Sequence, residues 1–569
     1  MLSKIYYLFD KKRLSLLIII FIFSIIAMLL ETIGIGLLIP LVMIVSDNNF
    51  IQNYSEIVDY FPFILEMNRN QIITVASLFF ISFYIIKIFF VGLLNYLNAY
   101  FVQTQQVYLS DRLLKHYLSL PYSFHLKTNS SSLIRNVVSE VGYFVAILSS
   151  LLYLTADILI AVGLSIFLLI YDFKTAIIII FIFSIGGYLF DFLFKSKLKY
   201  WGENRLIHTE KLFKALQESL GGIREIIIYG KYNEFLNFFK YHNYNHSIIK
   251  KLVAFTSNLP RLWYEILGIS ILMTILLLNL GNKSISDITT LLIIFSAASL
   301  RLMPIFNRIV ISFQNLRTFK PSIDILFNEL TKNLIVKNDF NNSGEILLRN
   351  SLKIKNVFFQ YDLKEKLTLD NVNLEIKKNE IIGIFGKSGS GKTTLLDIII
   401  GILKPSKGMV LIDDIDIHKN PRSYQKIIGY VSQNIFLIDD TLEKNIAFGL
   451  KDKEIDNLKL KEAIKNSALN NYIDNLKYGI KTTVGEKGTR ISGGQRQRVG
   501  IARALYFSPS ILILDEATNA LDEKTEDEIL QTIKDLKGKI TVIIVSHKSS
   551  SLKFCDKIIK LDNGKIISD

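Results

Sequence analysis

The chain has 569 residues and a formal net charge of +15, and half of its residues are hydrophobic. Only 21% of the residues are charged, below the roughly 25% of an average soluble protein, and the mean hydropathy is +0.34. This composition rules out a disordered chain and argues against a purely soluble enzyme, and the single cysteine, Cys555, leaves no intramolecular disulfide and no thiolate metal cluster.

Six apolar runs in the first 330 residues are each long enough to cross a membrane, which takes about 20 mainly apolar residues. They are Leu14–Val45, Ile72–Leu97, Val141–Ile170, Thr175–Phe194, Leu252–Leu280 and Ile288–Ser312. Because other spans follow it, the first run is expected to be a span and not a cleaved signal peptide. The pattern predicts a transmembrane domain at residues 1–332.

Lysine and arginine are concentrated in the N-terminal segment and in the loops 98–140 and 195–251. The positive-inside rule therefore predicts that the N-terminus and these loops are cytoplasmic. The basic charge then reflects topology and contact with membrane lipid, and we expect no nucleic-acid partner. Both loops are expected to be helical extensions of the spans, because long structureless loops are uncommon. Each extension is expected to reverse direction, at Leu120-Pro121 and at Gly221-Gly222.

From Ser351 onward short β-rich runs alternate with helical ones, after an expected linker at residues 333–350. The runs that read as buried strands are Ile381–Phe385, Ile427–Val431, Ile511–Leu514 and Val542–Val545. Such alternation is typical of an α/β domain with a largely parallel core. We therefore expect a second domain at residues 351–569.

A phosphate-binding loop follows the first of these strands. It reads Gly386, Lys387, Ser388, Gly389, Ser390, Gly391, Lys392, Thr393, with Thr394 opening a helix to Ile402. This matches the pattern G-x-x-x-x-G-K-[ST] in its required context of strand and helix. Glycines let backbone N–H groups converge on phosphate oxygens, and the helix N-terminus adds its positive dipole end. Lys392 is expected to contact the β- and γ-phosphates, and the Thr393 hydroxyl to bind Mg²⁺.

Two further segments carry candidate nucleotide chemistry. The run Ile511–Leu514 ends in Asp515 and Glu516. Asp515 is then placed near Mg²⁺, and Glu516 is placed to polarise an attacking water. Ser492, Gly493, Gly494 and Gln495 open a helix about 20 residues earlier. They form a second anion-binding terminus.

The order of these motifs resembles the ATP-binding cassette of ABC transporters, over about Ser351–Asp569. The resemblance implies that Tyr361 stacks on adenine, that Gln433 senses Mg²⁺, and that His547 touches the γ-phosphate. Asn519–Asp522 is similar to the D-loop of these cassettes, with Asn519 where serine is commoner. With Glu516 and His547 both present, the resemblance implies hydrolysis of ATP. One chain holds one phosphate loop and one Ser-Gly-Gly segment, so it also implies a homodimer with two equivalent ATP sites.

Four cations inside or beside the apolar runs are candidates for a substrate path: Lys87, Arg261, Arg301 and Arg308. Intramembrane charges are costly and usually face a cavity or a partner. Counted along the helices, all four lie in the inner half of the membrane or at its inner boundary, where they could meet an anionic headgroup. In the alternative interpretation Arg261 pairs with Glu265, Arg308 reaches toward the interface, and Lys87 or Arg301 pairs with Glu31.

The membrane half has its own resemblance, carried by Leu300–Pro304, Asn307–Ile309, Leu259–Arg261, Leu30–Thr32 and Ser322–Ile325. These segments are similar to bacterial flippases of lipid-linked oligosaccharides. The family implies an ATPase of the inner membrane that moves a polyprenyl-pyrophosphate-linked oligosaccharide, with a cytoplasmic cassette. It also implies that an external segment, here 49–65, meets the lipid tail; a plain interfacial helix is the alternative.

The sequence therefore predicts an all-α membrane domain of six transmembrane helices followed by an α/β P-loop ATP-binding cassette. A flippase of a lipid-linked saccharide is the preferred function. An exporter of other lipids, drugs or peptides is one alternative, and a nucleotide-gated channel or sensor that does not hydrolyse ATP is the other. The second alternative is opposed by the presence of Glu516.

Overall fold

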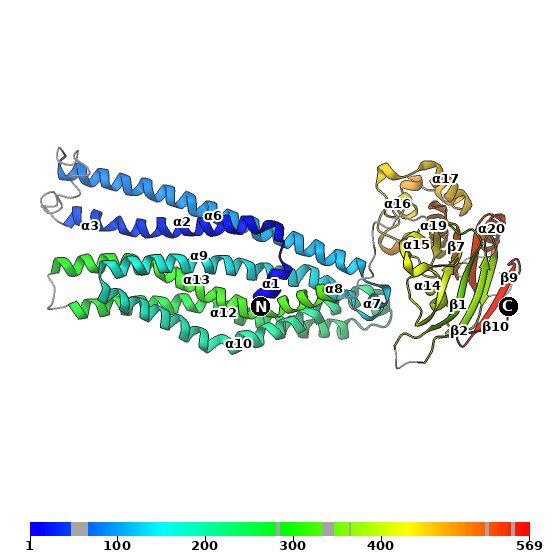
Figure 1. Ribbon diagram of the computed structural model, residues 1–569, viewed down its shortest axis with the longest axis horizontal. Coiled ribbons are helices and arrows are strands. Elements are labelled where there is room, and N and C mark those ends of the chain that lie inside the picture. Colours follow the sequence, from blue (N-terminus) through cyan, green and yellow to red (C-terminus); the bar gives the residue numbers. More distant parts are fainter. Residues whose placement is uncertain are drawn as a thin grey trace. The chain divides into compact units, whose positions relative to one another are not determined.

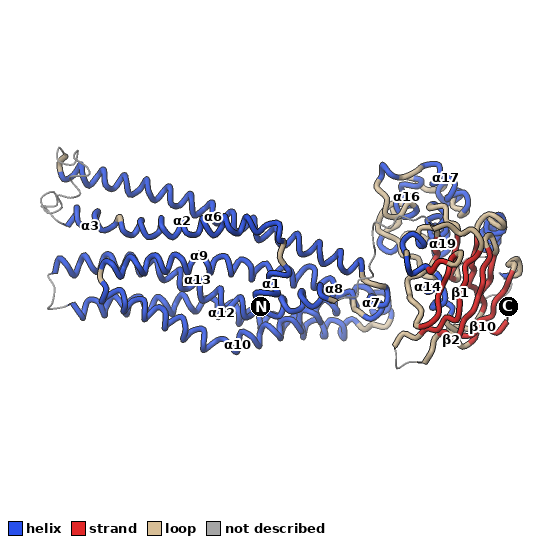
Figure 2. Tube along the Cα trace, viewed as in Figure 1, coloured by secondary structure: helices blue, strands red, loops and turns tan. Residues whose placement is uncertain are grey.

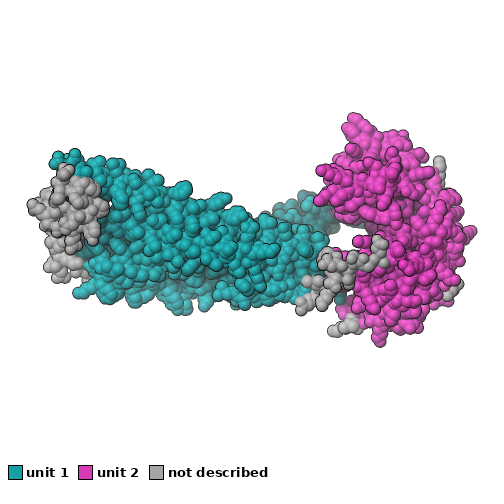
Figure 3. Space-filling model, turned by 45° about the horizontal axis from the view of Figure 1, so that its top comes forward, with its two compact units in different colours: residues 1–120, 125–334 teal, residues 121–124, 335–569 magenta. Residues whose placement is uncertain are grey.

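The computed structural model describes residues 1–46, 67–279, 285–332, 346–362, 366–517, 523–547 and 552–568. The external segment 49–65, most of the linker 333–350 and the segment 519–522 lie outside these residues. The chain divides into two compact units (Figure 3). The first comprises Met1–Leu120 and His125–Leu334, and the second comprises Pro121–Phe124 and Ile335–Asp569.

The first unit is a bundle of long helices (Figure 1). In chain order its helices are α1 (Leu2–Leu8), α2 (Leu14–Gly36), α3 (Leu38–Ser46), α6 (Arg69–Ser119), α7 (Tyr122–Lys127, which begins in the second unit), α8 (Ser130–Arg135), α9 (Val141–Tyr171), α10 (Phe173–Gly221), α11 (Ile223–Ile228), α12 (Tyr232–Asn279) and α13 (Ile285–Thr331). Among the described residues, six helical stretches are long and apolar enough to cross a membrane, which confirms the six predicted spans.

The long helices extend well beyond the apolar runs. Helix α6 has 51 residues, about 77 Å at 1.5 Å per residue, against a hydrocarbon core of about 30 Å. It ends at Ser119, immediately before Leu120-Pro121, and α10 ends at Gly221. Proline disfavours helical backbone in the residue before it, which accounts for the first reversal. Both helices thus end where the sequence predicted.

Small residues let these helices pack closely. A Cβ on Gly202 of α10 would lie 2.3 Å from the backbone oxygen of Thr318 in α13, closer than atoms can approach. One apolar core of this unit joins α9, α10, α12 and α13 around buried aromatic side chains such as Phe183, Tyr264 and Phe295. Helix α13 of this core also carries Arg301, Arg308 and Arg317, which are described below.

The second unit contains two sheets and their covering helices (Figure 2). The antiparallel sheet has the order β2-β1-β4-β5, from β1 (Ser351–Phe359), β2 (Leu369–Lys377), β4 (Lys407–Ile412) and β5 (Ile415–Asp416). The larger sheet has the order β10-β9-β3-β8-β7-β6, from β3 (Ile381–Phe385), β6 (Ile428–Val431), β7 (Ile511–Asp515), β8 (Thr541–Ser546), β9 (Lys557–Asp562) and β10 (Lys565–Ser568). All its pairings are parallel except that of β9 with β10, as predicted for a largely parallel core.

The remaining helices of this unit connect and cover the strands. They are α14 (Lys392–Ile399), α15 (Pro421–Gln425), α16 (Leu442–Ile446), α17 (Asn457–Asn466), α18 (Asn470–Asp474), α19 (Gly493–Tyr506) and α20 (Glu523–Asp535). The helix predicted to reach Ile402 ends three residues earlier, at Ile399. The backbone turns there, and Gly401 adopts a positive φ of 76° that favours glycine.

Candidate functional site

Three segments leave the larger sheet at one edge. Strand β3 pairs in parallel with β8, so that Phe385 lies opposite Ser546, and β7 pairs with β8, so that Asp515 lies opposite Val545. The residues that follow these strands are therefore neighbours, because the carboxyl ends of parallel strands meet at the same edge. This register brings together the phosphate loop, Glu516 and His547.

The loop after β3 begins at the buried Gly386 and ends at the buried Lys392. Lys392 is 6% exposed, and its Nζ donates to the backbone oxygens of Gly386 and Lys387, both at 2.9 Å. A Cβ on Gly386 would lie 2.3 Å from the backbone oxygen of Leu561, so only glycine fits there. Gly389 and Gly391 adopt positive φ angles of 79° and 101°. These constraints curl the backbone around the lysine ammonium group.

The top of this loop is open to solvent. Lys387, Ser388 and Gly389 are exposed, as is Thr393 at the start of α14. Inside the loop, the hydroxyl of Ser390 is buried and has no hydrogen-bond partner among the described residues. A buried hydroxyl without a partner is uncommon, and a phosphate oxygen in the loop would provide one. The loop therefore fits the nucleotide phosphates that the sequence predicted.

Glu516 stands at the centre of a hydrogen-bonded group of three side chains. Gln433 donates from Nε2 to Glu516 Oε2 at 2.8 Å, and His547 Nε2 lies 2.5 Å from Glu516 Oε1. Glu516 itself is 9% exposed and has a positive φ of 51°. Such strained backbone is concentrated at functional sites. The sequence suggested these three residues separately. In the structure the Glu516 carboxylate lies between the amide of Gln433 and the imidazole of His547.

The neighbouring acid, Asp515, is buried beneath this group. Burial raises the pKa of its carboxyl group, and the charge of Glu516 acts in the same direction. Burial lowers the pKa of the Lys392 ammonium group, against the charges of Glu516 and Asp515. The oxygen donors of Thr393, Gln433 and Asp515 are of the kind that Mg²⁺ prefers, so these residues fit the ion predicted for them.

Two residues of this region were not among the predicted site residues. The hydroxyl of Tyr430, in β6, donates to Asp515 Oδ2 at 3.4 Å. Asp397, in α14, is 9% exposed, and burial together with the charge of Asp515 raises the pKa of its carboxyl group to about 6. An acid on the buried face of a helix after a phosphate loop was the available sequence signal for Asp397.

Tyr361 lies beside the phosphate loop. It is 39% exposed, its hydroxyl is 3.0 Å from the hydroxyl of Thr394, and its ring packs edge-on against Phe359. The ring is therefore anchored from both sides while part of it stays accessible, which is compatible with the adenine contact predicted for it.

Ser492 caps the N-terminus of α19. Its backbone N–H donates to Gln495 Oε1 at 2.9 Å, and the Gln495 N–H donates back to Ser492 Oγ at 3.3 Å. Ser492 and Gly493 are exposed, and Gly494 is partly so. Within the described ranges no hydrogen bond joins this segment to the phosphate loop. Because Ser492 and Gly493 are exposed, this helix N-terminus is accessible to a ligand.

In the membrane unit, one buried acid holds two of the predicted cations. The side chain of Glu31, in α2, is 2% exposed; its Oε2 lies 3.3 Å from Lys87 Nζ of α6, and its Oε1 pairs with Arg301 of α13. Lys87 also lies 3.7 Å from the ring centroid of Tyr84 and is 6% exposed at its side chain, whereas that of Arg301 is 46% exposed. The alternative of pairing with Glu31 is therefore realised for both cations.

Arg308, for which the alternative was to reach toward the interface, has an acidic partner instead. It binds Asp157 of α9 through three hydrogen bonds of 2.5 to 3.1 Å, and the side chains of Arg308 and Asp157 are 49% and 4% exposed. Asp157 is the sole charge in its apolar run, but the sequence did not indicate its partner. Arg261 and Glu265 are both exposed, and the ion pair suggested between them is not formed in the described structure.

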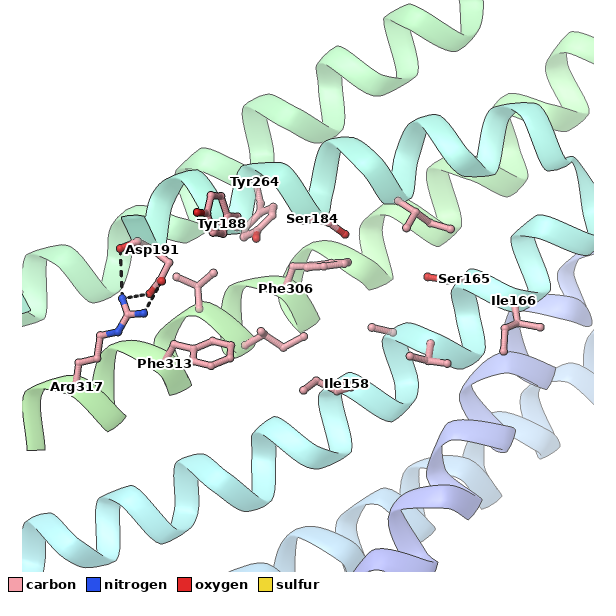
Figure 4. Close-up of a pocket in the computed structure, with 16 residues that line it drawn as sticks. Ile158, Ser165, Ile166, Ser184, Tyr188, Asp191, Tyr264, Phe306, Phe313 and Arg317 are labelled. Carbon is pink, nitrogen blue, oxygen red and sulfur yellow. Dashed lines mark hydrogen bonds and ion pairs between the residues drawn. The ribbon is translucent and has the colours of Figure 1, made fainter. Parts of the chain in front are cut away.

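A cavity of about 580 Å³ lies between α9, α10, α12 and α13 (Figure 4). Its lining is mainly apolar, with Ile158, Ile166, Tyr264, Phe306 and Phe313 among the contributors. At one end Arg317 of α13 donates to both carboxylate oxygens of Asp191 of α10 (Figure 4). Because this guanidinium group is already neutralised, the cavity suits an apolar ligand.

Comparisons with known proteins match both units. Residues 14–303 match the family profile of the ABC transporter transmembrane region, and residues 369–519 match the family profile described as ABC transporter. The ATP-dependent lipid A-core flippase of Ralstonia nicotianae is 26% identical over 80% of this chain and 77% of its own length. The ATP-dependent lipid A-core flippase of Wigglesworthia glossinidia brevipalpis is 28% identical over 84% of this chain and 82% of its own length.

The fold of the whole chain is similar to that of a bacterial Atm1-family ABC exporter solved with ATP bound. That likeness has a TM-score of 0.79 and covers 95% of this chain and 93% of the exporter chain, at 21% sequence identity. At such identity the likeness concerns the fold. It spans the six apolar helices and the α/β unit together.

Proposed function

Because the chain belongs to the ABC transporter family and is an ATP-hydrolysing exporter with a fused membrane region, we propose that it flips a polyprenyl-pyrophosphate-linked oligosaccharide across the bacterial inner membrane. It acts as a homodimer, with its N-terminus and its nucleotide-binding unit in the cytoplasm. The multi-pass membrane region and the relatives named as lipid A-core flippases support a lipid substrate.

One observation carries the choice of an anionic lipid. Glu31 neutralises only one of its two cations, so that Glu31, Lys87 and Arg301 together keep a net charge of +1 among apolar helices. An uncompensated charge in such surroundings is costly unless it is paired. A diphosphate group linked to a lipid is a ligand that would bring the missing negative charge to this depth.

In the nucleotide site, each residue of this chain has a defined task. The phosphate loop and Lys392 bind the phosphates, and Glu516, held by Gln433 and His547, accepts the proton of the attacking water. Thr393 and Asp515 would hold Mg²⁺, which neutralises phosphate charge when it is bound. Ser492–Gln495 of a second chain would close each site from the opposite side.

Translocation in proteoliposomes tests this function. The reconstituted chain is expected to move a polyprenyl-diphosphate oligosaccharide in an ATP-dependent manner, and Glu516→Gln is expected to abolish the movement. Asp527→Asn, at an exposed acid of α20, is the matched control and should behave as the parent. ATP turnover without translocation of this lipid would refute the proposed substrate.

The apolar cavity favours a second candidate, an exporter of amphipathic compounds without a diphosphate. Its residues Phe306 and Val310 are each two positions from Arg308, about 200° around the helix, so these two residues and Arg308 occupy different faces of α13. This candidate predicts that varied apolar compounds stimulate ATP turnover and that Ser184→Phe, which would fill the cavity, removes the stimulation. The diphosphate lipid alone would stimulate turnover under the preferred function.

A further inference from the structure

The acid that holds Arg301 differs from the acid that holds Arg308 in one respect. Glu31 contacts a second cation, Lys87, on its other oxygen. Asp157 contacts Arg308 alone among the described cations. Both acids are buried, and both arginines are about half exposed. The two pairs therefore respond differently if an incoming anion takes the arginine away.

Removing Arg308 from Asp157 would leave a buried carboxylate without a partner, which is strongly unfavourable. Removing Arg301 from Glu31 would leave Glu31 paired with Lys87. Lys87 cannot easily move away, because it is buried against the ring of Tyr84 and lies close to Gly34 of α2. The hydroxyl of Tyr84 in turn donates to the backbone oxygen of Gly34 at 3.4 Å, which fixes α2 against α6.

The three members of the cluster also lie at a common level. Glu31 is 15 residues from the end of α3, Lys87 is 18 residues from the start of α6, and Arg301 is 16 residues from the start of α13. At 1.5 Å per residue these separations are about 23, 27 and 24 Å. A ligand that reaches this level meets the exposed Arg301 and not the buried Lys87.

We infer that Glu31 is a resident counter-anion that a lipid diphosphate displaces from Arg301, while Lys87 keeps Glu31 neutralised after the exchange. This inference rests on the proposed function and deepens it. Arg301 becomes the residue that contacts the ligand, and Glu31 and Lys87 become positioning residues. The exchange also provides selectivity, because a neutral lipid cannot replace the carboxylate.

Binding to the purified full-length protein in nanodiscs tests the exchange, with a polyprenyl diphosphate as the probe and the matching polyprenol as the neutral comparison. Glu31→Gln removes the competing carboxylate and is expected to tighten diphosphate binding roughly tenfold, the change that 1.4 kcal/mol produces. Arg301→Gln should abolish the preference for the diphosphate over the polyprenol.

Lys87→Met separates the exchange from direct contact of the ligand by Lys87. On its own it should weaken diphosphate binding, because Glu31 then has only Arg301 as a partner. Combined with Glu31→Gln it should recover at least the parental affinity, since no acid then remains to be neutralised. If Lys87 contacted the ligand directly, the double variant would stay weak, and the inference would be wrong.

Asp191→Asn is the matched control, because it also frees an arginine of α13, Arg317, from a carboxylate of a neighbouring helix. It lies away from the cluster and should leave diphosphate affinity unchanged; a similar tightening would show a general charge effect and overturn the inference. ATP turnover of each variant reports correct folding. Failure of the parent to bind the diphosphate would overturn the proposed function and the inference together, whereas parental binding without rescue by the double variant overturns the inference alone.

Discussion

Replacing Glu516 by glutamine separates the chemistry of its carboxylate from its place in the structure. Glutamine has the same shape, so its amide oxygen can still accept the hydrogen bond that Gln433 now donates at 2.8 Å. Its NH₂ group can donate to the nitrogen of a neutral His547, which stands 2.5 Å from the present carboxylate. Both contacts are therefore retained, and what is lost is the ability to accept a proton at pH 7.

The size of the expected effect follows from that loss. A positioned general base contributes about 10²- to 10⁴-fold to a rate, or about 3 to 5 kcal/mol of activation free energy at 1.36 kcal/mol per factor of ten. Because the phosphate loop is untouched, ATP should still bind with parental affinity. The variant should accordingly accumulate with ATP bound.

Two assays on the detergent-solubilised protein measure these quantities: steady-state phosphate release, and the increase in melting temperature on addition of ATP with Mg²⁺. The prediction is a large fall in phosphate release with an unchanged ATP-induced increase. A variant that kept most of the parental turnover would refute the assignment of Glu516 as the base. Loss of the ATP-induced increase would indicate instead that the side chain holds the nucleotide site together.

Three other changes test the packing and the charges. Gly202→Ala places a methyl group against the backbone of α13 and should lower the free energy of unfolding by about 1 to 3 kcal/mol, seen as a lower melting temperature. The control is Gly92→Ala, whose methyl group meets nothing within 4 Å and should leave the melting temperature unchanged. Equal melting temperatures of the two variants would contradict the close packing of α10 against α13. Arg308→Met leaves the buried Asp157 carboxylate without its arginine partner and should destabilise the membrane unit by about 3 to 5 kcal/mol, measured as a lower melting temperature. Adding Asp157→Asn should recover most of that loss. For Asp397, whose pKa is raised to about 6, the folded state favours the neutral acid, so its contribution to stability is full below about pH 4 and is lost as the pH rises through 6. Asp397→Asn should therefore stabilise the nucleotide-binding unit near pH 7 by at most about 3 kcal/mol, with no gain at pH 4; melting curves across this range would show a constant difference if the reasoning is wrong.

Much of the nucleotide site was accessible from sequence because its signals are local. The strand Ile381–Phe385, its loop and the start of α14 occupy consecutive residues, and glycine spacing reports backbone geometry directly. The strand that ends in Asp515 was equally clear, since a buried run that ends in two adjacent acids is typical of a chain with a phosphate loop. The reversal at Leu120-Pro121 was visible for a similar reason, because proline constrains its own neighbour.

Tertiary structure alone decided how separate segments combine. Gln433, Glu516 and His547 follow the strands β6, β7 and β8, and only the parallel register of these strands sets the edge at which they meet. Motif recognition suggested each residue, but not that one carboxylate is held between an amide and an imidazole.

The membrane charges show the same division. The amount of apolar sequence determined the six spans, because the thickness of the bilayer is a constraint that each run meets by itself. The partner of each buried cation depends instead on helix rotation and crossing, for which apolar sequence carries little information. The sequence suggested that Lys87 or Arg301 pairs with Glu31 but not that both do, and the pairing of Asp157 with Arg308 was not anticipated. Composition therefore determined that this chain enters a membrane, and local motifs determined that it binds a nucleotide. The packing of α2, α6, α9 and α13 decided how the buried acids and the cations pair, and so which positive charge we infer to be available to a ligand.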